Sequence, residues 1–214
     1  MKRILIFVST IGLFNLVKAQ TEPTTFGVKA GINFQNITGH DMNGYQLGNR
    51  LKAGLSLGAN AQIPLTTDFY LQPGLEFNQK GAKSGDGYYS TTLNYIDVPV
   101  SIVYKPEVGA GHLILGAGPY IGFGVGGHVS DGTTNTQVIY QNQINPNDAN
   151  SGYPYFKRVD AGANLFAGYE MTNRVSFQIN AQLGVAKTNP TIAGYSDPSA
   201  AKNTGFGFSV GYRF

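Results

Sequence analysis

The feature of the sequence that most restricts its fold is a two-residue alternation between apolar side chains and small or polar ones. It is clearest in the last ten residues, where Phe206, Phe208, Val210, Tyr212 and Phe214 alternate with glycine, serine and arginine. Successive side chains of a β-strand point to opposite faces of the sheet, so this pattern is typical of a strand with two different faces. The sequence therefore predicts an all-β chain.

The alternation recurs often enough to predict eight strands. Their approximate ranges are 26–35, 51–63, 68–82, 92–105, 111–129, 154–170, 175–185 and 205–214. Several are longer than the five or six residues usual in globular sheets. Their polar faces are crowded with glycine and serine, which leave room for other side chains. Both features favour the narrow interior of a closed barrel.

The connections between the predicted strands alternate in length. Those at 64–67, 106–110 and 171–173 are short, whereas those at 36–49, 83–91, 130–153 and 188–202 are long and rich in polar residues. Outer-membrane barrels have short periplasmic turns and long external loops. The sequence therefore predicts an eight-stranded antiparallel up-and-down transmembrane β-barrel in the outer membrane. Because alternation alone does not distinguish inside from outside, a soluble lipocalin-like binding barrel remains an alternative.

The first residues predict export. A basic start at Lys2 and Arg3, an apolar run to Val17 and the small residue Ala19 are typical of a secretory signal peptide. We expect a cleaved signal peptide over residues 1–19 and a barrel domain over 20–214. Beyond Ala19 the basic and acidic residues are equal in number, so no nucleic-acid partner is expected. The chain has no cysteine, which excludes disulfides and thiolate metal sites.

Motifs that suggest catalysis fall in the wrong structural context. The G-x-S-x-G matches at 54–58 and 207–211 lie inside predicted strands, whereas a nucleophile elbow needs a sharp strand-to-helix turn. The glycines between Gly116 and Gly127 also lie on a strand, with no helix to hold a phosphate. His112 and His128 fall at opposite ends of that strand, too far apart to share a metal ion. We therefore expect no catalytic residue, no metal and no cofactor, and a protein that is not an enzyme.

Charged residues on the polar faces predict a network of ion pairs in the lumen. The interior of an eight-stranded barrel is just wide enough for side chains to fill, so charges there have to be paired. The candidates are Lys29, Lys52, Glu76, Lys80, Asp97, Arg158, Asp160, Glu170 and Arg213. A gated narrow path through the barrel is the functional alternative to this structural interpretation.

Aromatic residues suggest two further features. Those at strand ends predict two girdles at the membrane interfaces. One girdle would contain Phe26, Tyr70, Tyr104, Tyr169, Tyr212 and Phe214, and the other Phe34, Phe77, Tyr155, Phe156 and Phe206. Tyrosines among small polar residues in the long loops suit an adaptable contact surface. These contact candidates are Tyr45, Tyr88, Tyr89, Tyr140, Tyr153 and Tyr195.

Several segments, taken in order, resemble the PorT-like outer-membrane β-barrel proteins. They are Phe26-Gly27-Val28-Lys29-Ala30-Gly31, Tyr95-Ile96-Asp97-Val98-Pro99-Val100, Gly116-Ala117-Gly118-Pro119-Tyr120-Ile121-Gly122, Asp160-Ala161-Gly162 and Ala167-Gly168-Tyr169-Glu170. The end of the chain, with Tyr212 and Phe214, resembles the terminal aromatic signature of outer-membrane barrels. The resemblance implies the same eight-stranded fold, and it offers no catalytic residues.

Two functions follow as hypotheses. The first is a non-enzymatic outer-membrane protein that acts through its external loops or as an accessory of an envelope assembly or secretion complex. The second is a small porin-like channel. The expected partners are outer-membrane lipid, the barrel-assembly machinery during insertion, and an envelope or secretion complex.

Overall fold

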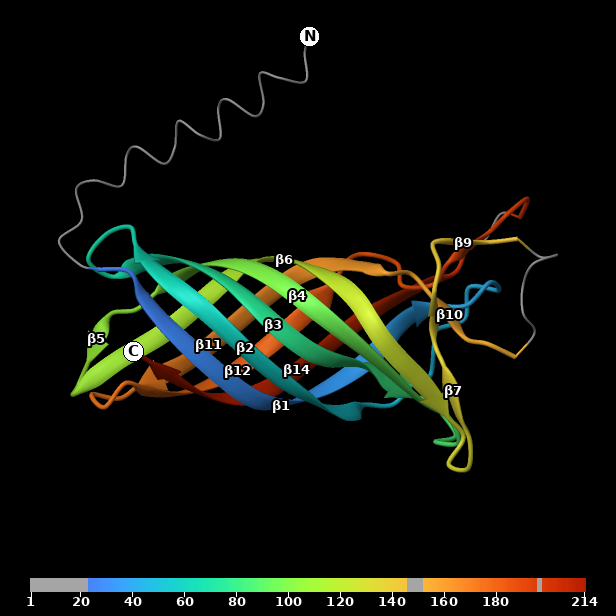
Figure 1. Cartoon of the computed structure of the whole chain (residues 1–214), viewed down its shortest axis with the longest axis horizontal. Helices are drawn as coiled ribbons and strands as arrows, with labels where there is room; N and C mark the ends of the chain where they lie inside the picture. The colour runs from blue at the N-terminus through green and yellow to red at the C-terminus, as the bar shows by residue number, and fades with distance from the viewer. Residues whose placement is uncertain (1–22, 146–151, 196–197) are drawn as a thin grey trace, which may run out of the picture.

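The computed structural model describes residues 23–145, 152–195 and 198–214, so the predicted signal peptide at 1–19 lies outside the described residues. Eight long strands form a closed antiparallel barrel (Figure 1). They are β1 (Thr25–His40), β2 (Lys52–Pro64), β3 (Phe69–Lys83), β4 (Ser90–Tyr104), β6 (Gly111–Ser130), β11 (Val159–Glu170), β12 (Val175–Gly184) and β14 (Ala200–Arg213). Each pairs with its neighbour along the chain, and β14 pairs with β1 to close the barrel. The predicted fold class is confirmed.

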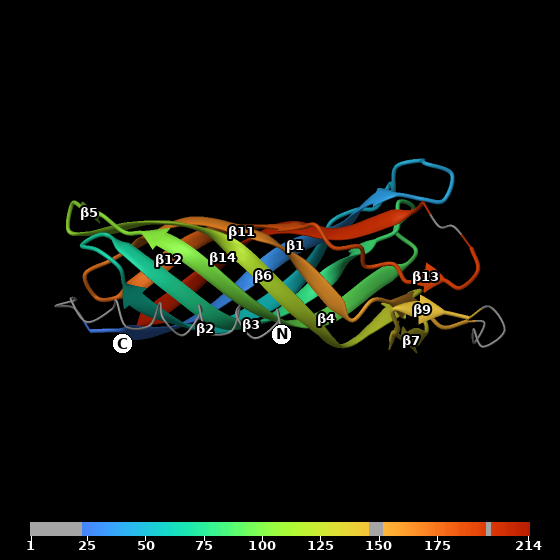
Figure 2. The same ribbon diagram turned by 90° about the horizontal axis from the view of Figure 1, so that it is seen from above.

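Six short strands lie in the connections. They are β5 (Glu107–Val108), β7 (Asn135–Gln137), β8 (Ile139–Tyr140), β9 (Gln143–Ile144), β10 (Tyr155–Phe156) and β13 (Thr191–Ile192). All except β5 gather at one end of the barrel, opposite the C-terminus (Figure 2). We call the connections at this end the first (41–51), second (84–89), third (131–158) and fourth (185–199) external loops. In the described part of the chain no helix is long and apolar enough to cross a membrane.

The barrel wall continues beyond the predicted strands at the external end. β1 runs to His40 and β14 begins at Ala200, and the two strands stay paired up to these residues. This extension was predicted to be loop because its residues show no apolar alternation. Both faces of a strand that stands above the lipid meet water or loops, so the pattern is not required there. At the third loop the wall strand is instead shorter than predicted, because residues 154–158 precede β11 and do not belong to it.

The polarity of the barrel is inverted relative to a soluble protein. Outward side chains of the wall are apolar and exposed, and buried side chains are largely polar. The exposed set includes Val28, Ile32, Leu55, Leu57, Leu75, Val98, Val100, Ile102, Leu115, Ile121, Phe123, Leu165, Phe177, Ile179, Leu183, Phe206, Phe208 and Val210. A continuous apolar belt of this size is rare on soluble monomers and matches a lipid environment.

Aromatic pairs stand at both ends of this belt. Phe34 stacks on Phe206 with ring centroids 5.4 Å apart, and Phe69 stacks on Tyr104 at 4.8 Å. Tyr70, which was predicted in the girdle, is not part of it. Its neighbour Phe69 faces outward, so Tyr70 turns to the interior, where the Lys105 ammonium lies 5.9 Å from its ring. The prediction was wrong by one residue, and a shift of one reverses the face.

Glycines on β6 make room for particular interior side chains. A Cβ added to Gly116 would lie 2.1 Å from the Phe166 ring, and one added to Gly124 would lie 2.4 Å from the Tyr140 ring. These glycines therefore serve packing within the lumen.

Candidate functional site in the lumen and at the external mouth

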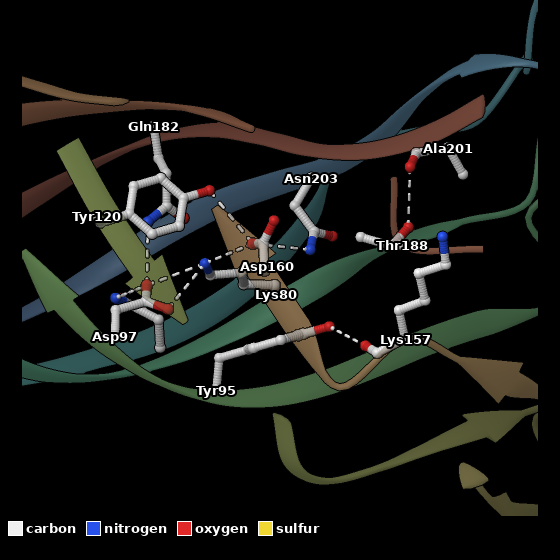
Figure 3. Close-up of polar contacts among 11 residues, drawn as sticks. Lys80, Tyr95, Asp97, Tyr120, Lys157, Asp160, Gln182, Thr188, Ala201 and Asn203 are labelled. Carbon is white, nitrogen blue, oxygen red and sulfur yellow. Dashed lines mark hydrogen bonds and ion pairs between the residues drawn. The ribbon is translucent and has the colours of Figure 1, made fainter. Parts of the chain in front are cut away.

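A buried ion cluster occupies the middle of the lumen (Figure 3). The strand register places Asp97 opposite Gly122 and Gly122 opposite Asp160, so the two carboxylates stand on either side of a residue without a side chain. The Lys80 Nζ reaches between them and lies 2.9 Å from an oxygen of each. All three side chains are fully buried. We call Lys80, Asp97 and Asp160 the central cluster.

Neutral donors complete the central cluster. The amides of Asn78 and Gln182 donate to Asp97 at 2.9 and 3.0 Å. The amide of Asn203 and the hydroxyl of Tyr120 donate to Asp160 at 3.1 and 3.2 Å. These hydrogen bonds compensate the second carboxylate, which one lysine cannot neutralise.

Two aromatic rings cover the lysine. The Lys80 ammonium lies 4.3 Å from the centroid of the Tyr120 ring and 5.0 Å from that of Tyr95. Rings at this distance attract a cation and also exclude water from it. The central cluster therefore fills the cross-section with bonded side chains.

A second group of charges lies toward the periplasmic end. Glu170 pairs with Lys105 at 2.7 Å and with Arg213 at 3.6 Å, and Arg213 donates to the side-chain carbonyl of Asn60 at 3.0 Å. Lys29 pairs with Glu76 at 2.7 Å. Each of these three cations in the periplasmic half of the lumen thus lies beside a carboxylate, and Glu170 serves two of them.

A small polar cavity of about 50 Å³ lies in the lumen between these two layers. It is lined in part by Asn33, Gln35, Asn180 and Gln182, each with a buried amide atom that has no protein partner. A cavity needs about 10–15 Å³ to hold one water, so this one has room for a few. Polar lining and unmet hydrogen-bonding groups suit internal water, and the volume is far too small for an open bore.

Apolar packing closes the external mouth. Val138, Tyr140 and Phe156 of the third loop pack against a buried core that includes Leu93 and Tyr95 of the wall. The predicted place of Phe156 in a girdle is therefore wrong. The Tyr140 hydroxyl donates to the Gly126 carbonyl at 3.0 Å, and the Tyr95 hydroxyl donates to the Lys157 carbonyl at 3.1 Å. We call this part of the third loop, β8 with β10, the mouth plug.

The structure brings together most of the predicted lumen charges and separates two of them. Lys52 donates to the Ala53 carbonyl at 3.3 Å and is not ion-paired with any described carboxylate. Arg158 is exposed, and its guanidinium lies 6.0 Å from the Tyr140 ring of the third loop. The predicted placement of Arg158 in the lumen is wrong, because β11 begins one residue later. Lys105 was not predicted in the lumen, although it lies an even number of residues from Tyr95, Asp97 and Val103, whose side chains point inward.

The predicted contact tyrosines also separate into two groups. Tyr45, Tyr88, Tyr89, Tyr153 and Tyr195 are exposed in the external loops. Tyr140 is instead partly buried in the mouth plug, so its prediction as an external contact is wrong. Loop composition gave no sign that one tyrosine folds back into the barrel.

Side chains suggestive of catalysis or metal binding stay apart. Ser56 and Ser209 of the two G-x-S-x-G matches lie within β2 and β14, each opposite Gly31, with no turn at either serine. His112 and His128 lie near opposite ends of β6. Over the described ranges, no three His, Asp or Glu side chains are grouped to hold a metal ion.

Comparison with known proteins gives one family match. Residues 18–188 match the family described as outer membrane protein beta-barrel domain. No curated protein matches the sequence.

Solved outer-membrane proteins have a similar overall structure at low identity. Neisserial surface protein A aligns with a TM-score of 0.48, Ail of Yersinia pestis with 0.44 and a major outer membrane protein of Thermus thermophilus with 0.47. Each is 12% identical, and each alignment covers 90% of this chain and 100% of the other.

Proposed function

This chain belongs to the outer membrane protein β-barrel family, and from that premise we propose that it is a non-enzymatic surface protein that binds its partner through the external loops. A barrel of this family has three surfaces on which to act: the lumen, the lipid-facing belt and the loops. The proposal rests on the observation that side chains of the protein fill the lumen.

The lumen is occupied by its own side chains. The mouth plug, the central cluster and the periplasmic ion pairs follow one another along the axis, and a cavity of about 50 Å³ lies between the last two. Eight-stranded barrels are generally filled in this way, whereas aqueous porins have about 16–18 strands. A small porin-like channel is therefore the less favoured alternative.

The loops offer the contact surface that the lumen lacks. Tyr45 and Tyr195 are 72% and 71% exposed, and Tyr88, Tyr89 and Tyr153 are also at the surface. Tyrosine supplies a large contact area at a low cost in conformational entropy, which suits recognition. The exposed apolar belt of the wall argues against the soluble lipocalin-like alternative, because such a belt would aggregate in water.

The PorT-like resemblance extends the proposal to the class of partner. The namesake of the PorT-like proteins is linked with a protein-secretion pathway, and on that link we propose an accessory role in an envelope assembly or secretion complex. Export with a cleaved signal peptide at residues 1–19 and insertion by the barrel-assembly machinery, with Tyr212 and Phe214 as the terminal signature, belong to the same proposal.

Cross-linking on intact cells tests the proposal. A membrane-impermeant lysine cross-linker can reach the exposed Lys83 and Lys187 at the external end. We expect a reproducible partner to be captured with the tagged wild-type protein. Replacing residues 42–45 with a Gly-Ser segment, together with Tyr195→Ser, should remove that partner.

Val108→Ser is the matched control, because Val108 is an exposed apolar side chain at the opposite end of the barrel. It should leave the capture unchanged. Equal capture by the loop variant and the wild type would show that the loops do not carry the function.

A further inference from the structure

A pocket of about 290 Å³ lies among the external loops, apart from the lumen. Tyr89 of the second loop and Tyr153 of the third line it, together with Asp131, Thr134, Thr136 and Val129. The volume is near the lower end of the range for small-molecule sites. The pocket therefore suits a single small chemical group.

The β6–β7 hairpin fixes one side of the pocket. Val129 pairs with Thr136 in the strand register. Asp131 Oδ1 accepts the backbone N–H groups of Thr133 and Thr134 at 2.9 and 2.6 Å. These bonds from Thr134 and Thr133 hold the pKa of Asp131 below its usual range. The carboxylate is therefore charged at neutral pH and is held in one position.

The second loop fixes Tyr89 on another side. Its backbone N–H donates to the Ser84 Oγ at 2.8 Å, and its carbonyl accepts the Ser84 N–H at 2.8 Å. The Tyr88 and Tyr89 rings form a T-shaped pair with centroids 4.9 Å apart. Short loops closed by such bonds lose little entropy when a ligand binds.

The charge of the pocket selects the ligand. Its lining includes one carboxylate and no basic side chain, and over the described residues no cation lies within ion-pair distance of Asp131. An unpaired carboxylate repels anions. Tyrosine rings attract cations through their faces, and aromatic pockets recognise organic ammonium groups in this way. We propose that this pocket binds a small organic ammonium group, held by the Asp131 carboxylate and the rings of Tyr89 and Tyr153.

The inference rests on the proposed function, since it names a ligand chemistry for two of the external loops, the second and the third. The group could be the quaternary ammonium of a choline headgroup or the primary ammonium of a lysine side chain. Both present a cation that the carboxylate and the rings recognise together. A neutral group of the same shape loses this attraction.

Calorimetric titration of the folded full chain with choline and with n-butylammonium tests the inference. A polyoxyethylene detergent is required, because amine-oxide and phosphocholine detergents carry ammonium groups themselves. The control ligand is 3,3-dimethyl-1-butanol, the uncharged isostere of choline. We expect one of the ammonium probes to bind at least about tenfold more tightly than this isostere, and the tighter probe distinguishes a headgroup from a lysine.

Variants locate the binding. Tyr89→Ala and Tyr153→Ala should each weaken it about two- to fivefold, as expected for exposed cation–π contacts. Asp131→Asn keeps the shape and the Oδ1 acceptor but removes the charge, and it should weaken binding by a similar factor. Val108→Ala, at the opposite end of the barrel, should have no effect.

Equal affinity for choline, n-butylammonium and the isostere, or unchanged binding in Asp131→Asn, would overturn the inference. The two experiments distinguish a failure of this inference from a failure of the proposed function. Loss of the cross-linked partner in the loop variant with no ammonium binding refutes this inference alone. Ammonium binding with a partner unaffected by the loop variant refutes only the proposed function.

Discussion

Lys80 holds the lumen together at the scale of single residues. Its ammonium lies between two fully buried carboxylates, and the tyrosine rings around it exclude water. Transfer of such charges out of water is costly, and their mutual attraction offsets that cost only while every partner is present. The central cluster should therefore be sensitive to the loss of one member.

We predict that Lys80→Met lowers the free energy of unfolding by about 3–5 kcal/mol, because it strands two buried carboxylates. Urea unfolding in detergent micelles, followed by tyrosine fluorescence, measures the loss. Lys187→Met is the control at an exposed lysine and should change stability by less than about 0.5 kcal/mol. The triple variant with Asp97→Asn and Asp160→Asn should recover most of the loss. Equal stability of Lys80→Met and Lys187→Met would contradict this account.

The odd or even position of a residue within its strand allowed us to predict which side chains point into the lumen. Lys29, Glu76, Lys80 and Asp97 follow the alternation, so their direction could be inferred before their partners were known. Which of these charges form ion pairs could not be inferred, because that depends on the stagger between strands. Arg158 and Tyr70 were misplaced for a common reason: near a strand end, an error of one residue reverses the face or moves the side chain out of the sheet.

At the scale of elements, the third external loop is divided between two roles. β8 and β10 pack into the mouth, while the β6–β7 hairpin and Tyr153 face the surroundings. Tyr140 is the anchor of the mouth plug, since its ring lies over Gly124 and its hydroxyl is bonded to Gly126. Removing that anchor should release the loop and leave the barrel intact.

Tryptic digestion of the folded protein tests the anchor, because Lys157 and Arg158 lie in the same loop. We predict that Tyr140→Ala, and Gly124→Ala by displacing the ring, speed cleavage there several-fold. Gly126→Ala is a control on the same strand, since an added Cβ has no neighbour closer than 4.0 Å. Slow cleavage in all three variants would show that the plug is held by other contacts.

The long wall strands were predictable, whereas the short strands of the loops were not. Lipid requires an apolar outward face, and this requirement imprints the alternation on each spanning segment. The parallel pairs β8–β10 and β9–β13 lie beyond the lipid and join residues far apart in sequence. Lipid therefore imposes no apolar alternation on these short strands. The register shift between Asn94 and Tyr95 on β4 likewise left no trace in the residue pattern.

At the scale of the whole molecule, the barrel has three successive barriers along its axis. They are the apolar mouth plug, the hydrogen-bonded central cluster and the periplasmic ion pairs. Each is built from side chains of several strands, so the closure belongs to the fold and not to a single movable gate. We infer that the protein acts through its external surface, because its polarity is inverted, its lumen is filled and its loop tyrosines are exposed.

Planar-bilayer recording of the pure folded protein tests this central claim most directly. A filled lumen predicts no resolvable single-channel steps from the wild type, at either sign of the applied voltage. An unrelated porin of about 16 strands, reconstituted in the same way, provides the positive control. Reproducible discrete steps from the wild-type protein would contradict the account and establish the lumen as the site of function.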